Sequence, residues 1–216
     1  MGFQRWPEHV NTGQPNQNIS NLCSTDSLKQ GTMNKSKLAP TRVPKAEPVR
    51  LCIDIGSGKN SKAGFVGIDA IDFGQKYVHD VRNGLPFEAN TVDEVNSSHF
   101  VEHLTGTERV AFFNDLYRVM KVGAVATIVT PNWSHACAYG DPTHQWPPMS
   151  SWYTLYLDKN WRDSQAPHVA YTCDFVGGVA GKWDARLNGR DFEFTQAAMN
   201  NETNAWRDLI CTLTKR

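Results

Sequence analysis

The sequence predicts an α/β domain built around an open, largely parallel β-sheet. Short apolar segments that stop at a glycine or an acidic residue recur between residues 49 and 97, as buried parallel strands do. A helix with an amphipathic pattern follows them, and another apolar segment stands directly after that helix. Such an order of elements packs best as a mostly parallel sheet covered by helices.

The first part of the chain differs from the rest. Residues 1–48 are rich in Asn, Gln, Ser, Thr, Pro and Lys and have no sustained apolar periodicity. A stretch of this kind buries too little apolar surface to offset its ordering entropy. We therefore expect a disordered polar and basic N-terminal arm over residues 1–48 and a folded domain over residues 49–216.

The composition limits the partners and the compartment. The chain carries 22 basic and 22 acidic residues, and this balance argues against a nucleic-acid partner, which requires positive potential. Its five cysteines are scattered and never form a C-x-x-C pair, which predicts reduced thiols. No apolar run approaches the roughly 18 residues of a membrane span. We predict a cytoplasmic protein without a membrane partner.

Four strands are predicted before the helix. The first, Val49–Ile55, is short, apolar and rich in β-branched residues. The others are Gly64–Asp69, Lys76–Asp80 and Thr91–Ser97, of which the last places Val92 and Val95 inward. The helix itself begins at a capping box formed by Thr105 and Glu108. Its apolar residues recur at helical spacing as Val110, Phe113, Leu116, Tyr117 and Met120.

The C-terminal half is predicted in less detail. Lys121 and Gly123 end the helix, and a fifth strand over Ala124–Thr130 follows. Residues 131–167 form an aromatic- and proline-rich segment that we assign to the substrate side, with a short helix at Ser150–Leu157. The last expected elements are a strand at His168–Phe175, a hairpin at Leu187–Arg190 and a strand at Trp206–Thr214.

The segment D-I-G-S-G-K-N over residues 54–60 contains the letters of a phosphate-binding P-loop but not its spacing. A P-loop needs a glycine five residues before Gly58, where Ile53 stands, and a hydroxyl after Lys59, where Asn60 stands. The segment is therefore not a P-loop.

The same segment suits a nucleoside-containing cofactor. A strand that runs straight into Gly56 and Gly58 lets the backbone approach a ligand without a Cβ in the way. Asp69 stands at the end of the next strand, where a carboxylate can accept hydrogen bonds from two ribose hydroxyls. On these residues alone, a nicotinamide dehydrogenase and an adenosylmethionine-dependent methyltransferase both stay open.

A longer series of motifs separates these two classes. In order along residues 49–132 the chain reads D-I-G-S-G, G-F-V-G-I-D, H-D-V-R-N-G-L-P-F, S-S-H-F-V-E-H, E-R-V-A-F-F-N-D-L-Y-R-V-M-K-V-G and T-P-N. The series resembles the class I S-adenosylmethionine-dependent methyltransferases, and most of all their compact subgroup, methyltransferase domain 11. The resemblance implies a Rossmann-like fold whose mostly parallel central sheet ends in an antiparallel C-terminal strand. The short spacing between Gly56 and Val66 implies a shortened first helix.

The resemblance also assigns residues to S-adenosyl-L-methionine. It places the glycine loop against the methionine part of this cofactor, Asp69 at its ribose, the Asp80–Val81 step at its adenine, and two serines of the fourth strand below its methyl group. The cofactor-binding residues that it implies are Asp54, Gly56, Ser57, Gly58, Asp69, Asp80, Val81, Ser97 and Ser98.

On the acceptor side, the residue types suggest a small molecule or glycan methylated at oxygen or nitrogen by in-line displacement, which requires alignment and sometimes a base. His144 and His99 are the candidate bases, because a histidine pKa suits proton transfer near neutral pH. Tyr139, Asp141 and Trp146 are the candidate substrate contacts. No histidine or cysteine spacing typical of a strong metal site occurs, so we expect no metal.

Two departures from the family pattern leave alternatives open. Asn60 replaces the usual third glycine, and K-V-G-A stands for the usual K-P-G-G. A non-catalytic module that binds a cofactor or partner with the same fold is therefore the alternative to an enzyme. A nucleic-acid methyltransferase is less favoured, because T-P-N-W at 130–133 is not the signature of amino-methylating DNA enzymes.

Overall fold

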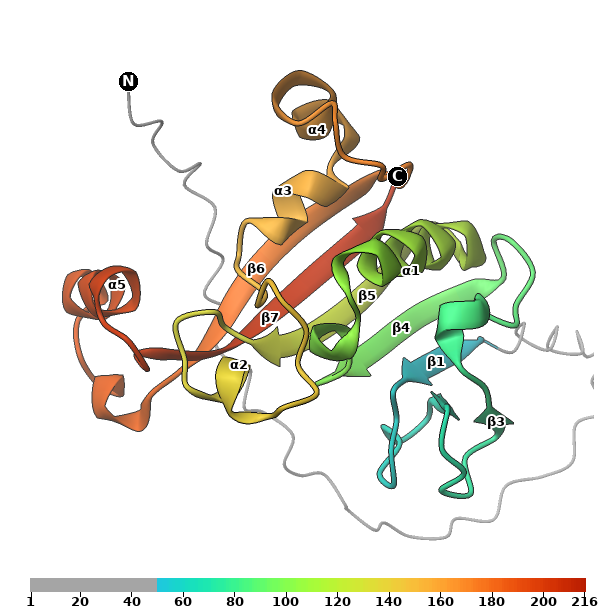
Figure 1. Cartoon of the computed structure of the whole chain (residues 1–216), viewed down its shortest axis with the longest axis horizontal. Coiled ribbons are helices and arrows are strands. Elements are labelled where there is room, and N and C mark those ends of the chain that lie inside the picture. Colours follow the sequence, from blue (N-terminus) through green and yellow to red (C-terminus); the bar gives the residue numbers. More distant parts are fainter. Residues whose placement is uncertain (1–49) are drawn as a thin grey trace, which may run out of the picture. The chain divides into compact units, whose positions relative to one another are not determined.

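The strands form one seven-stranded sheet in the order β3-β2-β1-β4-β5-β7-β6 (Figure 1). In the computed structural model, which describes residues 50–216, they are β1 Cys52–Ile55, β2 Val66–Asp69, β3 Tyr77–Val78, β4 Val92–Ser98, β5 Met120–Pro131, β6 Phe175–Trp183 and β7 Trp206–Lys215. The pairs among β1 to β5 are all parallel. β7 is antiparallel to both of its neighbours, β5 and β6. The predicted parallel sheet with an antiparallel C-terminal strand is confirmed.

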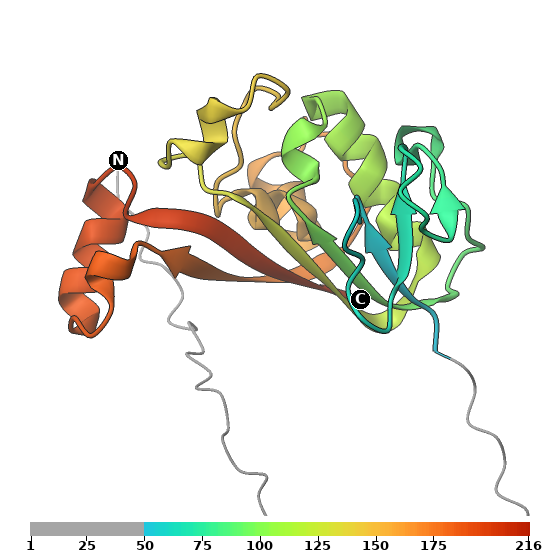
Figure 2. The same cartoon turned by 90° about the horizontal axis from the view of Figure 1, so that it is seen from below.

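Helices α1 to α4 lie on one side of this sheet, and α5 lies beyond the ends of β6 and β7 (Figure 2). The helices are α1 Gly106–Val119, α2 Cys137–Gly140, α3 Tyr153–Leu157, α4 Lys159–Gln165 and α5 Phe192–Asn201, with 3-10 turns η1 Val81–Asn83, η2 Val101–His103 and η3 Ala185–Leu187. None of these helices crosses a membrane, because within the described residues none combines the length and the apolar character that a span needs.

The core lies between the sheet and α1. From the sheet, Ile53, Ile55 and Ile128 are fully buried, and from α1, Phe113 and Leu116 are equally buried. Residues of a parallel strand alternate between the two sheet faces, so every second strand residue meets the helix layer. This burial of apolar surface is the main stabilising contribution to the sheet-and-helix packing.

Helix α1 begins as the sequence predicts. The Thr105 hydroxyl accepts a hydrogen bond from the Glu108 N–H, and the Glu108 carboxylate accepts one from the Thr105 N–H, which is the expected capping box. The helix ends at Val119, slightly before the predicted Lys121. Met120 and Lys121 already belong to β5, where the Lys121 Nζ binds the Asp93 carboxylate at 2.7 Å.

The expected short first helix is reduced to turns. Residues 56–65, which connect β1 and β2, contain only turns and bends and no helix. The backbone of this loop is instead held by side chains at the strand ends, as described below.

Two C-terminal predictions are wrong. His168–Phe175 is not a strand: the sixth strand starts only at Phe175, and the preceding backbone donates hydrogen bonds from Thr172 and Cys173 to the Asn114 side chain. The side-chain amide of Asn114, on α1, thus accepts the hydrogen bonds that a neighbouring strand would otherwise accept.

The second wrong prediction is the hairpin at Leu187–Arg190. Asn188 and Gly189 do form a turn, with φ of +75° at Gly189, but the turn connects η3 to α5. The Asp191 carboxylate accepts a hydrogen bond from the Phe194 N–H and so caps α5. This N-terminal cap favours a helix after the turn in place of a strand. The predicted arm, residues 1–48, lies outside the described residues.

Candidate functional site

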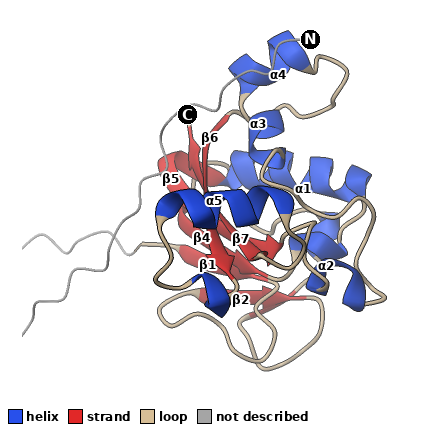
Figure 3. Ribbon diagram, turned by 90° about the vertical axis from the view of Figure 1, so that its left-hand side faces the viewer, coloured by secondary structure: helices blue, strands red, loops and turns tan. Residues whose placement is uncertain are grey.

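The carboxyl ends of β1, β2 and β4 meet at one edge of the sheet, the edge that faces the viewer in Figure 3. Because neighbouring parallel strands end together, Ile55 lies opposite Ile68 on one side and Ser97 on the other. Open α/β sheets bind ligands outside this edge. The predicted cofactor residues from three separate stretches of sequence are therefore brought together here.

Asp54 is buried, at 4% exposure, and holds the loop after β1. One carboxylate oxygen accepts a hydrogen bond from the Lys62 N–H at 2.7 Å. The other accepts one from the Asn96 side-chain amide at 2.6 Å. Asp54 thus ties the loop of residues 56–65 to β4.

Asp69 faces the same loop from the end of β2. Its Oδ2 accepts a hydrogen bond from the Gly58 N–H and its Oδ1 accepts one from the Ile71 N–H, each at 2.9 Å. A carboxylate has about four acceptor positions, so both oxygens keep one for a ligand. The carboxylate is half-buried and fixes the position of the glycine loop.

The two glycines of this loop adopt backbone conformations that favour glycine. Gly56 has φ of +68°, and a Cβ there would lie 2.7 Å from the Phe100 side chain. Gly58 has φ of +51°, and a Cβ there would meet no atom within 4 Å. The loop therefore borders open space at Gly58, beside the free acceptor positions of Asp69. A cradle of bare backbone next to a carboxylate fits an amino-acid nucleoside such as adenosylmethionine.

Asp80 and Val81 follow β3. The Asp80 carboxylate caps η1 by accepting from the Arg82 N–H, and it binds the Arg82 guanidinium at 2.7 Å. This hydrogen bond to Arg82 lowers the pKa of Asp80. Val81 is buried, whereas the Asp80 side chain is partly exposed. A ligand at this position would share the Asp80 carboxylate with Arg82.

The two predicted serines of β4 point to opposite faces. Ser97 is fully buried and its hydroxyl has no hydrogen-bond partner, whereas Ser98 is exposed. Two further buried polar atoms without a partner, the Thr130 hydroxyl and Asp208 Oδ1, lie at the adjoining end of the β5–β7 pair, one residue pair apart in the register. Sequence reasoning missed both, because an isolated Thr or Asp in a strand carries no signal.

His99 and Glu102 form a pair directly after β4. His99 has φ of +54°, a strained conformation for a residue with a Cβ. Its Nδ1 lies 3.2 Å from Oε1 of Glu102, which is buried. The neighbouring Glu102 carboxylate raises the pKa of His99. The predicted base His99 thus has a carboxylate partner that orients its ring.

Arg109 on α1 is buried and binds backbone carbonyls of two segments. Its guanidinium donates to the carbonyls of Val101 and Glu102 in η2, at 3.1 and 3.4 Å, and to those of Gln145 and Pro147, at 3.1 and 2.5 Å. Sequence reasoning missed this residue. An arginine in register with Phe112, Phe113 and Leu116 on the buried face of a helix was the available signal.

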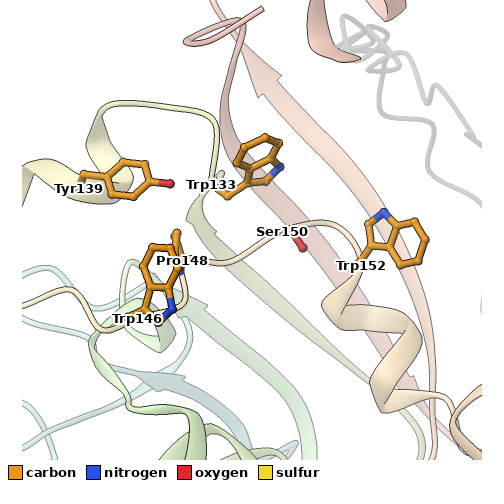
Figure 4. Close-up of a pocket in the computed structure, with 6 residues that line it drawn as sticks. All are labelled: Trp133, Tyr139, Trp146, Pro148, Ser150 and Trp152. Atoms are coloured by element: carbon orange, nitrogen blue, oxygen red, sulfur yellow. The ribbon is translucent and has the colours of Figure 1, made fainter. Parts of the chain in front are cut away.

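An aromatic groove is formed in part by Trp146 and Pro148 (Figure 4), the neighbours of Pro147, whose carbonyl Arg109 binds. It has a volume of about 410 Å³ and is lined by Trp133, Tyr139, Trp146, Pro148, Ser150 and Trp152. The Tyr139 hydroxyl points toward the Trp133 indole (Figure 4). The side chains of Tyr139 and Trp146, both predicted substrate contacts, are 57% and 77% exposed. Asp141, the third, does not line the groove.

Asp141 and His144 instead belong to a neighbouring cluster. Asp141 Oδ1 accepts hydrogen bonds from the N–H and hydroxyl of Thr143. The His144 ring lies edge-on to the ring of His103, with centroids 4.8 Å apart. His144 and His99 are thus both close to Glu102 in the η2 turn, although 45 residues separate them in the sequence.

Comparison with known proteins finds similarity to methyltransferases. Residues 53–128 match a family described as a methyltransferase domain. A solved SAM-dependent methyltransferase from Archaeoglobus fulgidus is similar over 77% of this chain and 86% of its own, with 21% identity and a TM-score of 0.55. Geranyl diphosphate C-methyltransferase from Streptomyces coelicolor A3(2) is similar over 80% of this chain and 74% of its own, with 13% identity and a TM-score of 0.49. No curated protein sequence gives a significant match.

Proposed function

We propose that the chain is a class I S-adenosylmethionine-dependent enzyme that transfers the methyl group of this cofactor to an oxygen or nitrogen of a small molecule or glycan. The match of residues 53–128 to a methyltransferase domain and the similar fold of a solved SAM-dependent methyltransferase support this proposal. The observation that carries the proposal is the pairing of Asp69 with Gly58 beside open space. This pairing provides a carboxylate for ribose hydroxyls and bare backbone for the methionine part at one sheet edge.

The chain's residues divide the work between binding and alignment. Asp69 holds the ribose, and the loop of Gly56, Ser57 and Gly58 supports the methionine part. Asp54 positions this loop from below through the Lys62 N–H. When bound, the cofactor supplies a methyl group that its positive sulfur makes electrophilic. The protein mainly has to place an acceptor in line with that methyl group.

The acceptor side is proposed to lie at the aromatic groove and the His99–Glu102 pair. Exposed indole and phenol rings at Trp133, Tyr139 and Trp146 provide flat surfaces on which a sugar or ring can stack. His99, held by Glu102 at 3.2 Å, is the group best placed to receive a proton from the acceptor. Scattered cysteines without a pairing motif support the cytoplasm as its location.

The direct test has two steps. Isothermal calorimetry of the full chain with adenosylmethionine and adenosylhomocysteine should give saturable heats with dissociation constants of about 1–100 μM, or roughly −8 to −5.5 kcal/mol. Incubation with methyl-labelled cofactor and a panel of hydroxyl- and amine-bearing acceptors should then transfer label to a small molecule. Absence of heat with either ligand would contradict the proposal at its first step.

A binding module without turnover is the second candidate, and one observation favours it. The connection from β1 to β2 contains no helix, so the glycine loop lacks a helix N-terminus to support the ligand. Tight binding of the cofactor together with no labelled product across the acceptor panel would favour this module over the enzyme.

A further inference from the structure

We propose that Glu102, His103 and His144 form a binding site for a divalent transition-metal ion, with Zn²⁺ as its representative. Each of the three residues offers one ligand atom, and these atoms lie within 4.8 Å of one another. Tetrahedral zinc ligands at about 2.0–2.1 Å from the ion lie roughly 3.4 Å apart. The ligand atoms therefore need to approach one another by about 1 Å to enclose an ion.

The hydrogen bonds of His103 prepare it to bind a metal. Its Nδ1 lies 2.9 Å from the Thr143 hydroxyl. That hydroxyl donates its own proton to the Asp141 carboxylate at 2.7 Å, so it can only accept from His103. Nδ1 of His103 therefore carries the proton, and in the neutral ring Nε2 has the free lone pair.

The ring of His144 is in the same state for a different reason. Its Nδ1 lies 3.1 Å from the backbone carbonyl of Ala138, and a carbonyl can only accept a hydrogen bond. Nδ1 of His144 is thus protonated as well, which leaves its Nε2 lone pair free. Histidines that bind metals have this arrangement, in which the second ring nitrogen donates to a carbonyl, carboxylate or other acceptor.

Glu102 supplies an independent observation that points to a ligand. The residue is 4% exposed. Oε1 makes an ion-pair contact with His99 at 3.2 Å, but neither carboxylate oxygen has a hydrogen-bond partner. A buried carboxylate oxygen without a partner is costly. A cation between Glu102 and the two imidazoles would satisfy this oxygen.

The backbone around the three residues is fixed by the rest of the fold. The Gln145 N–H donates to the Glu102 carbonyl at 2.8 Å, and the buried Arg109 guanidinium binds carbonyls on both sides of the site. The η2 turn and the loop at residue 144 are therefore joined before any ion arrives. This pre-organisation distinguishes the cluster from histidines that meet by chance on mobile loops.

The donor set selects the class of ion. Two imidazoles and one carboxylate suit zinc and other first-row divalent ions, whereas magnesium and calcium prefer oxygen ligands alone. Three protein ligands leave at least one coordination position open for water or another oxygen ligand. The site is separate from the Gly58–Asp69 cradle, but it adjoins the proposed acceptor side, because Glu102 also holds His99.

The experiment measures binding of the metal alone to the full, tag-free chain after chelator treatment. Calorimetry with ZnCl₂ should show one equivalent bound by the natural chain. The variants His144→Gln, His103→Gln and Glu102→Gln should each weaken binding at least tenfold, whereas His168→Gln, an exposed histidine elsewhere, should leave it unchanged. Circular dichroism of the metal-free variants verifies that they are folded, and His144→Gln, on a partly exposed loop, is the safest of the three.

Thr143→Val tests the hydrogen-bond argument, because it removes the acceptor of His103 without removing a ligand. We expect it to weaken zinc binding by about 10–100-fold, as loss of such supporting groups does. Co²⁺ serves as a spectroscopic probe and should show no thiolate charge-transfer band, although Cys137 is exposed nearby in the sequence. The proposal is overturned if the natural chain binds no zinc, if the ligand variants bind like it, or if a thiolate band appears.

Discussion

The two halves of the candidate site differ in how many of their polar groups have hydrogen-bond partners within the protein. At the cofactor edge, formed by the loops that follow β1, β2 and β3, each of Asp54, Asp69 and Asp80 accepts at least two hydrogen bonds from the chain. At the acceptor edge, formed by the residues that follow β4 and β5 together with the start of β7, buried polar atoms have no partner: Ser97 Oγ, Thr130 Oγ1, Glu102 Oε2 and Asp208 Oδ1. Ser57 Oγ is the exception on the cofactor edge.

This difference separates a part of the candidate site whose polar groups the chain satisfies from a part whose polar groups it leaves without a partner. If the cofactor binds as proposed, hydrogen bonds within the protein already order its edge, which lowers the entropy cost of binding. The unpartnered groups of the acceptor edge cost stability in the free protein. Such groups are retained where a ligand, an ion or water satisfies them.

The largest expected effect is on the Asp54 network. Asp54→Ala removes two hydrogen bonds to a buried carboxylate, each worth about 1.5–3 kcal/mol. We expect the free energy of unfolding to fall by about 3 kcal/mol in urea denaturation. Asp72→Ala, which removes an exposed carboxylate bound to the Gly74 N–H, is the matched control and should change it by less than about 0.5 kcal/mol. Equal effects of the two variants would show that the cofactor edge does not depend on this network.

The next effect is on cofactor affinity. Asp69→Ala removes both the proposed ribose acceptor and the hydrogen bond to Gly58, so adenosylhomocysteine should bind about 100-fold more weakly, a loss of roughly 2.7 kcal/mol. Calorimetry with this variant and with Asp72→Ala as the control measures the difference. An unchanged dissociation constant for Asp69→Ala would remove the carboxylate from the cofactor site.

A smaller effect is expected at the glycine that borders open space. Gly58→Ala and Gly64→Ala both place a Cβ on a backbone with positive φ, at +51° and +81°, and neither Cβ meets another atom within 4 Å. Both should cost about 1 kcal/mol of stability through strain. Only Gly58→Ala should weaken cofactor binding, by about tenfold or 1.4 kcal/mol. If Gly64→Ala weakened cofactor binding as much as Gly58→Ala does, the loss of affinity would come from backbone strain and not from contact with the cofactor.

The smallest expected effect has the opposite sign. Thr130→Val replaces a buried hydroxyl that has no partner with a methyl group of similar shape, so the free energy of unfolding should rise by about 1 kcal/mol. The control is Thr154→Val, which removes a buried hydroxyl bound to the Ser151 carbonyl at 3.0 Å and should lower it by about 1 kcal/mol. Destabilisation by both variants would mean that Thr130 is satisfied in the free protein.

Local sequence patterns were sufficient where each element is set by its own residues. The capping box at Thr105, the apolar strands before it and the final strand at Trp206 all depend on nearby residues, and the structure confirms them. Of the residues predicted for the apolar stripe of α1, Phe113, Leu116 and Met120 are buried, whereas Val110 and Tyr117 are only partly buried. The pattern did not assign Arg109 to the core, although it occupies an inward position.

Sequence patterns failed where a side chain, distant or near, takes the backbone N–H groups of a segment. The segment before Phe175 has the alternation of a strand, but Asn114, 58 residues away from Thr172, takes its backbone N–H groups. The expected hairpin at Asn188 and Gly189 has the right turn residues, but Asp191 caps a helix after it. In both cases a side chain competes successfully for the backbone groups that a strand ladder would use.

The sequence by itself determined the parallel sheet, the glycine turn after the first strand and the acidic residue after the second, since backbone conformation and strand burial follow from neighbouring residues. The tertiary structure alone decided that Glu102 and His103 meet His144, about 40 residues later in the chain. That encounter depends on Arg109, whose guanidinium can join two remote segments only after α1 has packed on the sheet. Which backbone carbonyls a buried arginine binds cannot be predicted from the periodicity of the sequence.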